Sequence, residues 1–152
     1  MPVVSKLPND ARRLLALDVG DRRIGIAVSD PTGLLATPIE VYVRRGKVAD
    51  MEHLCRMADE YGAQGFVVGL PVNMNGSEGP QAAKTRDFAG TLGAEGQTVL
   101  LWDERLSTVE AERRMAEVGR KKRRGAVARS DAEAAAVILE TYLDALRMRV
   151  PQ

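Results

Sequence analysis

Two short apolar segments joined by a tight turn, within residues 14–30, constrain the fold of this chain more than any other stretch. Residues 14–19 are apolar apart from Asp18, and residues 24–28 alternate β-branched with small side chains. Residues 20–23, which read Gly-Asp-Arg-Arg, have the composition of a turn. The sequence therefore predicts a β-hairpin near the start of the chain, with one carboxylate inside its first strand.

The carboxylate of Asp18 needs a cationic partner, because an ionised group inside an apolar strand is costly to bury alone. Two partners fit the sequence. One is a divalent metal ion, and the other is a salt bridge to Arg22 or Arg23 in the turn. The hairpin by itself leaves both interpretations open.

Composition narrows the class of protein. The 152 residues are enough for one domain with a hydrophobic core, so we expect a flexible segment at 1–12 and a single domain at 13–150. Aromatic residues make up 4% of the chain, which disfavours a binding surface of stacked rings. The single Cys55 excludes an internal disulfide and a multi-cysteine zinc site, and the single His53 disfavours a Ser-His-Asp hydrolase. No signal peptide or membrane-spanning run is found, so we expect a cytoplasmic location.

The remaining pattern predicts an α/β fold with the order β-β-β-α-β-α-β-α-α. Beyond the hairpin, the expected strands are residues 37–43, 65–70 and 97–102, and the expected helices are 49–61, one from Pro80, 107–119 and one from Ser130. Ser107 with Glu110 and Ser130 with Glu133 have the spacing of capping boxes. We expect a five-stranded mixed sheet, a three-strand meander followed by parallel strands, with helices on both faces.

Three acids fall at the carboxyl ends of predicted elements or at a helix start. Asp18 ends the first strand, Glu104 follows the fifth, and Asp131 lies in the first turn of the last helix. The alternative for Asp131 is a carboxylate that only satisfies the helix dipole. If the first, fourth and fifth strands are parallel, the three acids meet at one sheet edge. Carboxylates without histidine suit Mg²⁺ or Mn²⁺, and two such ions would support a phosphodiester displacement.

A basic segment lies between the last two predicted helices. It places six positive charges within residues 119–129 without an acid, so the rest of the chain carries a net −5 against the total of +1. The residues are Arg120, Lys121, Lys122, Arg123, Arg124 and Arg129. Such a block attracts a polyanion, and the alternative is a solvated loop without a partner.

Four ordered blocks resemble the YqgF-type (RuvX) family of Holliday junction resolvases and pre-16S rRNA nucleases. The blocks are Asp-Val-Gly at 18–20 with 22–30, Gly-Leu-Pro at 69–71 with 74–80, Asp-Glu-Arg-Leu-Ser-Thr at 103–108, and the residues between 131 and 144. Together they cover nearly all of the chain from Leu14 onward. Two departures, Ser107 for the usual Thr and Asn75 for a common Asp, affect loop geometry and remove no proposed ligand.

The resemblance implies an RNase H-like fold and a metal-dependent nuclease, for which we expect two ions of Mg²⁺ or Mn²⁺. It places the catalytic and metal-binding acids on Asp18, Glu104 and Asp131, the acids already selected. The family is linked to 5′-end maturation of pre-16S rRNA and to branched DNA. We therefore expect a nucleic-acid partner, no membrane partner, and either a monomer or a homodimer.

Further residues are candidates for contacts with the nucleic acid. We expect Arg22, Arg23 and Arg105 to hold phosphates, Asn73 and Ser77 to touch the strand, and residues 120–124 to clamp the backbone. Phosphate contacts position a substrate without reading its sequence.

Two other functions fit part of the pattern. One is a non-catalytic nucleic-acid-binding or ribosome-associated factor that uses the basic segment. The other is an actin-like sugar kinase, which also opens with Asp-x-Gly in a hairpin. The kinase is disfavoured because this chain is too short for a second domain and lacks a P-loop.

Overall fold

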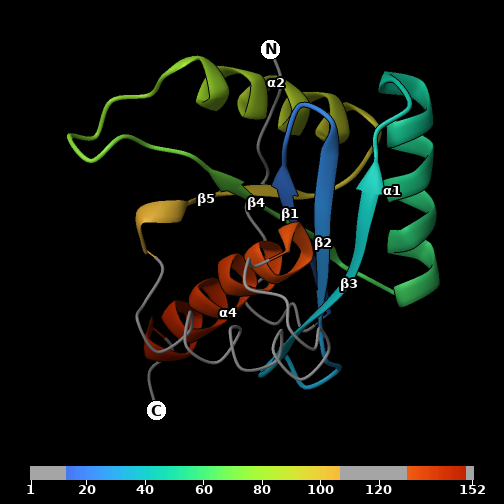
Figure 1. The fold of residues 1–152 in the computed structure, drawn as a ribbon. Helices are drawn as coiled ribbons and strands as arrows, with labels where there is room; N and C mark the ends of the chain where they lie inside the picture. Colours follow the sequence, from blue (N-terminus) through green and yellow to red (C-terminus); the bar gives the residue numbers. More distant parts are fainter. Residues whose placement is uncertain (1–12, 107–129, 150–152) are drawn as a thin grey trace, which may run out of the picture.

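A computed structural model describes residues 13–106 and 130–149 (Figure 1). The strands are β1 Leu14–Val19, β2 Arg23–Ser29, β3 Ala36–Val43, β4 Gly65–Leu70 and β5 Val99–Asp103. The helices are α1 Lys47–Tyr61, α2 Pro80–Ala94 and α4 Asp131–Arg149, with a 3₁₀ turn at Glu104–Leu106. The predicted flexible segment at 1–12, the helix at 107–119 and the basic segment at 120–124 lie outside the described residues.

The five strands form one mixed sheet, and the predicted fold class is confirmed. The order across the sheet is β3-β2-β1-β4-β5. β1, β2 and β3 form an antiparallel meander, whereas β4 runs parallel to β1 and β5 runs parallel to β4. The carboxyl ends of β1, β4 and β5 consequently lie at the same edge of the sheet.

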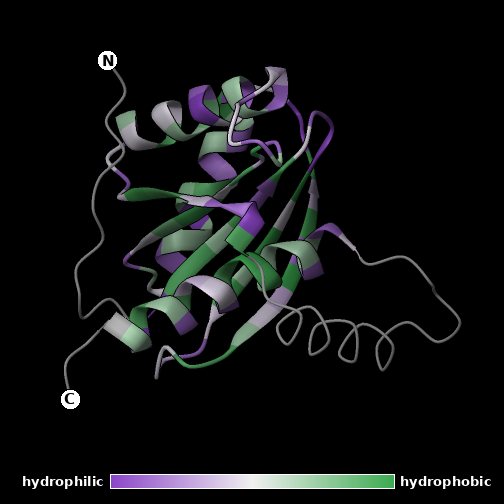
Figure 2. Ribbon diagram, turned by 90° about the vertical axis from the view of Figure 1, so that its left-hand side faces the viewer, coloured by the Kyte–Doolittle hydropathy of each residue, from purple (hydrophilic) through white to green (hydrophobic). Residues whose placement is uncertain are grey.

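Helices cover both faces of the sheet, and the alternation of β1 decides which side chains each face receives. Leu15, Leu17 and Val19 belong to the core under α1 and α2, whereas Leu14 and Ala16 belong to the core under α4. Figure 2 shows hydrophobic residues concentrated in the strands between the helical layers, with hydrophilic residues in the turns. Asp18 continues the alternation of Leu14 and Ala16 and therefore faces α4.

Most predicted boundaries agree with the structure, and the exceptions have simple causes. The predicted bounds of β1 and β4 are confirmed, and the other elements differ by one or two residues. The prediction for β5 was wrong at both ends, because pairing with β4 begins at Val99 and continues to Asp103. In α1 the buried side chains include Met57, whereas Cys55 is only partly buried.

No helix within residues 13–106 and 130–149 combines the length and apolar composition that a membrane span requires.

Part of the first sequence block serves the sheet itself. The Asp30 carboxylate accepts hydrogen bonds from the amides of Leu34 (2.9 Å) and Leu35 (3.0 Å), which closes the β2–β3 turn. Hydrogen bonds from the Leu35 amide and the Thr32 hydroxyl lower the pKa of Asp30 to about 2. These residues of the block are thus explained by folding alone.

A buried carboxylate at the start of α1 ties that helix to the β1–β2 turn. Asp50 has no exposed surface, and it accepts hydrogen bonds from the Tyr42 hydroxyl (2.9 Å), Arg44 Nε (3.0 Å) and the Arg45 amide (2.9 Å). Burial alone raises the pKa of Asp50, but these hydrogen bonds outweigh burial and hold it below the ordinary 3.8. Arg44 Nη1 also donates to the Gly20 carbonyl (3.0 Å), so the network reaches the turn that follows Asp18.

We expect Asp50→Asn to lower the free energy of unfolding at pH 7 by about 1.5–3 kcal/mol, the usual contribution of hydrogen bonds to a charged group. A folded-state pKa below the unfolded value stabilises the protein above about pH 4, and this stabilisation is lost as the pH falls. Urea unfolding at pH 7 and pH 3 should therefore show a smaller gap between wild type and variant at pH 3. Asp59→Asn, an exposed change on the same helix, is the control. An equal gap at both pH values would contradict the assignment.

Candidate active site

Asp18 is flanked by a glycine on each neighbouring strand. On β2 its register partner is Gly25. On β4 the partner of Leu17 is Val68, so the next residue, Gly69, lies beside Asp18. Because glycine has no side chain, the sheet surface around Asp18 is open to the close approach of other elements.

The first turn of α4 occupies the space that Gly25 leaves. A Cβ atom at Gly25 would lie 1.9 Å from the Asp131 carbonyl oxygen and 2.7 Å from the Ala132 nitrogen. The helix begins there because the predicted capping box is formed: the Ser130 amide donates to Glu133 Oε1 (2.9 Å), and the Glu133 amide donates to Ser130 Oγ (3.1 Å). Asp131 therefore lies against Gly25, the register partner of Asp18.

Glu104 approaches from the other side of Asp18. Its Oε1 atom lies 2.8 Å from the position of a Cβ at Gly69, and Ile138 Cδ1 of α4 lies 2.4 Å from the same position. Leu100 and Trp102 of β5 pack in the core under α4, as the alternation predicts. Glu104 follows β5 on this face, whereas Asp103 points to the opposite one.

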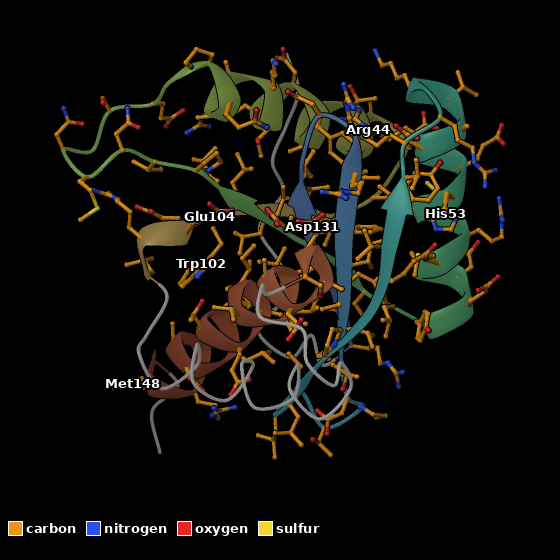
Figure 3. The ribbon with its side chains drawn as sticks, viewed as in Figure 1. Arg44, His53, Trp102, Glu104, Asp131 and Met148 are labelled. Atoms are coloured by element: carbon orange, nitrogen blue, oxygen red, sulfur yellow. The ribbon has the colours of Figure 1, made fainter. Side chains whose placement is uncertain are left out.

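The three predicted acids therefore lie at one edge and on one face of the sheet. Figure 3 labels Asp131 at the start of α4 and Glu104 just after β5. Asp18 and Asp131 line a common cavity of about 300 Å³, together with Gly20, Asp21, Arg22 and Arg23. Glu104 is not among the lining residues. Within the described parts of the chain, no three carboxylate, imidazole or thiol side chains are close enough to form a metal site.

Arg23 makes an ion pair inside this cavity. Its Nε atom lies 3.2 Å from Asp131 Oδ2, and the side chains are 63% and 37% exposed. An ion pair this exposed contributes at most about 1 kcal/mol. Arg23, one of the two turn residues expected as a salt-bridge partner for Asp18, pairs instead with Asp131.

Arg105 forms an ion pair with Asp103 at the end of β5. Arg105 Nη2 lies 2.7 Å from Asp103 Oδ2, and Nη1 donates to the Met74 carbonyl (3.4 Å) of the loop at residues 71–79. The hydrogen bond from the Arg105 guanidinium lowers the pKa of Asp103. Arg105 thus connects the end of β5 to this loop.

Asn73 and Ser77 shape the same loop. Asn73 Nδ2 donates to Ser77 Oγ (3.0 Å), and the Ser77 amide donates to Asn75 Oδ1 (3.0 Å). The substitution of Asn for the common Asp at position 75 preserves the acceptor oxygen that this bond uses. If Asn73 and Ser77 contact a nucleic-acid strand, that contact must share or replace these hydrogen bonds.

Gly25 and Gly69 were not singled out as site residues from the sequence, although a signal was present. Each interrupts a strand of β-branched or bulky residues, and an isolated glycine in a strand marks the close approach of another group. Which group approaches is visible only in the folded chain.

We expect Gly25→Ala to reduce the free energy of unfolding by about 1–3 kcal/mol or more, because the new Cβ overlaps backbone atoms that have little freedom to move. Gly79→Ala is the matched control, since a Cβ there meets only Asn73 Nδ2 at 4.0 Å. Urea denaturation of both variants measures the difference. Equal stabilities would show that α4 does not rest on Gly25.

Comparisons with known proteins agree with this architecture. A family model described as RuvX, Holliday junction resolvase, matches residues 12–145. A protein of Halothermothrix orenii named "Putative pre-16S rRNA nuclease" is 48% identical over 135 residues, covering 87% of this chain and 94% of the relative. A protein of the same name from Symbiobacterium thermophilum is 48% identical over 143 residues, covering 92% and 97%.

Among solved structures, RuvC of T. thermophilus in complex with a Holliday junction substrate matches with a TM-score of 0.65. The match covers 92% of this chain and 98% of RuvC at 14% identity, so it bears on the fold alone. The family model and the relatives, by contrast, match at the level of sequence over most of the chain. This chain therefore belongs to the RuvX family and is a nuclease with an RNase H-like fold.

Proposed function

We propose that this RuvX nuclease hydrolyses phosphodiester bonds at the cavity between Asp18 and Asp131, with Glu104 as the third acid. The observation that carries the proposal is the pair of glycines beside Asp18, because the Asp131 backbone lies against Gly25 and the Glu104 carboxylate lies against Gly69. Three acids that lie far apart in the sequence thus gather around one strand end.

We further propose that the three acids bind divalent cations, Mg²⁺ or Mn²⁺, as a pair of ions. The donor set fits, because carboxylate oxygens without imidazole or thiolate favour hard cations. The three carboxylates do not yet form a complete metal site, because Glu104 does not line the cavity and Asp131 is paired with Arg23. Asp18, Glu104 and Asp131 would hold the cations, and Arg23 would exchange its ion pair with Asp131 for another anion. Bound cations supply charge neutralisation at the phosphodiester and lower the pKa of water.

The remaining residues of the cavity have roles in holding the substrate. Arg22 and Arg23 are exposed at its rim, where a guanidinium released from Asp131 can pair with a phosphate. Arg105 and the loop at 71–79 stand at the same edge as Glu104. Residues 120–124 supply a further cluster of positive charge in the sequence.

The first substrate that we propose is the precursor of 16S ribosomal RNA, in the cytoplasm. The relatives that carry this name are 43–48% identical and match most of the chain. Branched DNA is the second candidate, because the matching family model is described as a Holliday junction resolvase. Resolving a junction needs two active sites and hence a homodimer, whereas a monomer suits trimming of one strand.

We expect Asp18→Asn, Glu104→Gln and Asp131→Asn each to lower the cleavage rate by about 100-fold or more with Mg²⁺ or Mn²⁺, the usual loss when one electrostatic stabiliser is removed. Asp59→Asn, an acid at the far end of α1, is the control and should cleave like wild type. Near wild-type cleavage by Asp18→Asn would refute the assignment. Binding without cleavage by the wild type, at any concentration of either metal, would favour the non-catalytic factor.

The substrate is decided by cleavage of three nucleic acids side by side: a pre-16S rRNA fragment, an unstructured RNA and a four-way DNA junction. We expect the ribosomal precursor to be cut most efficiently and binding to weaken steeply with salt, because phosphate contacts release counterions. Faster cleavage of the junction, together with a dimer in light scattering, would assign branched DNA instead.

A further inference from the structure

A second cavity lies on the opposite face of the sheet from the three acids. It has a volume of about 310 Å³ and is enclosed by α1, α2 and the β1–β2 turn. Asp21 in that turn lines both this cavity and the cavity of Asp18 and Asp131. A polymer bound at the acids and continuing over the turn would therefore reach the second cavity. Its size is at the lower end of the range for small-molecule sites.

The cavity is lined by apolar side chains and by the guanidinium of Arg44. Val19, Met51 and Phe88 are buried side chains of the core and line the cavity. Arg44 lies over the Phe88 ring with its Cζ 5.2 Å from the ring centroid. Figure 3 labels Arg44 just beyond the end of β3.

Arg44 is fixed in orientation. Its Nε donates to buried Asp50 (3.0 Å) and its Nη1 donates to the Gly20 carbonyl (3.0 Å), yet its side chain remains 27% exposed. A guanidinium that already donates through Nε and Nη1 and lies close to an aromatic ring is better suited to stacking than to a bidentate phosphate contact. Nucleobases stack on such planes in single-stranded recognition.

The rim mixes charges in a way that suits a whole nucleotide. Lys47 and Lys84 bring positive charge, and Lys84 Nζ lies 3.3 Å from Asp21 Oδ1. Asp87 and Gln81 add acceptors that can meet the amino groups of a base edge. An isolated phosphate would meet two carboxylates and an apolar floor, so the lining favours a base together with its phosphate.

We infer that this cavity is a subsite for one unpaired nucleotide of the substrate strand, where that strand continues from the acids over the β1–β2 turn. The base stacks on Arg44 above the Val19–Met51–Phe88 floor, and Lys47 and Lys84 meet the adjoining phosphate. The base must be unpaired, because a base inside a duplex does not present its face to a side chain. This inference rests on the proposed nuclease function and adds a preference for single-stranded segments.

The test measures binding of a fluorescein-labelled single-stranded 12-nucleotide RNA, and of a blunt duplex of the same sequence, to full-length protein carrying Asp18→Asn. Thr91→Trp fills the cavity from α2 without removing a charged group. We expect it to weaken single-strand binding about tenfold, the contribution of one stacked base. Lys47→Gln and Lys84→Gln should each reduce the salt slope of single-strand binding by about 0.7. Duplex binding should change less than twofold in all three.

Matched controls lie on the same helices. Ala83→Trp adds the same side chain to an exposed position of α2 that does not line the cavity, and Arg56→Gln removes one charge from exposed surface of α1. Both should bind the single strand like the parent. Circular dichroism of each variant establishes that it is folded before its binding is compared.

Single-strand binding by Thr91→Trp, Lys47→Gln and Lys84→Gln equal to that of the controls would overturn the subsite. An equal loss for single strand and duplex would also overturn it, since the cavity would then contact backbone only. The proposed function is tested separately by hydrolysis of bis(p-nitrophenyl) phosphate, a phosphodiester without a base, by the wild type with Mn²⁺. If the wild type does not hydrolyse this compound, the proposed nuclease site is wrong. The subsite predicts that Thr91→Trp, in an otherwise wild-type chain, hydrolyses it at the normal rate.

Discussion

The site depends on one close contact, the backbone of the first turn of α4 resting on Gly25 of β2. The contact is closer than any side chain would permit, since a Cβ at Gly25 would fall 1.9 Å from the Asp131 carbonyl oxygen. Because Gly25 is the register partner of Asp18, the same contact that packs the helix brings Asp131 to Asp18. The absence of a side chain at Gly25 therefore allows both the packing of α4 and the approach of Asp131 to Asp18.

The β1–β2 turn links this contact to the other face of the sheet. Arg44 holds the Gly20 carbonyl from the side of α1, and buried Asp50 holds Arg44. On the side of α4, Arg23 from the end of the turn pairs with Asp131. The turn that follows Asp18 is thus held by a partly buried ion pair on one face and by an exposed one on the other. The exposed pair is the one that a substrate or cation can replace at small cost.

Much of the fold followed from local patterns. The hairpin, the meander, the parallel strands and the second capping box were predicted because alternation, continuous apolar runs and turn residues act over a few positions. The choice of Asp18, Glu104 and Asp131 followed from strand ends and a helix start. The bounds of β5 were predicted wrongly because they depend on a partner distant in sequence: β5 continues to Asp103 because β4 pairs with it.

The amino-acid sequence by itself determined the order of strands and helices, the face of the sheet to which each side chain points, and the three acids at element ends, because these depend on periodicity and local hydrogen bonding. The tertiary structure decided how close those acids come, that Arg23 pairs with Asp131, and that a second cavity adjoins the first across Asp21. Distances between segments 27 to 113 positions apart, as from residue 104 to 131 and from 18 to 131, depend on packing, and no local pattern encodes them.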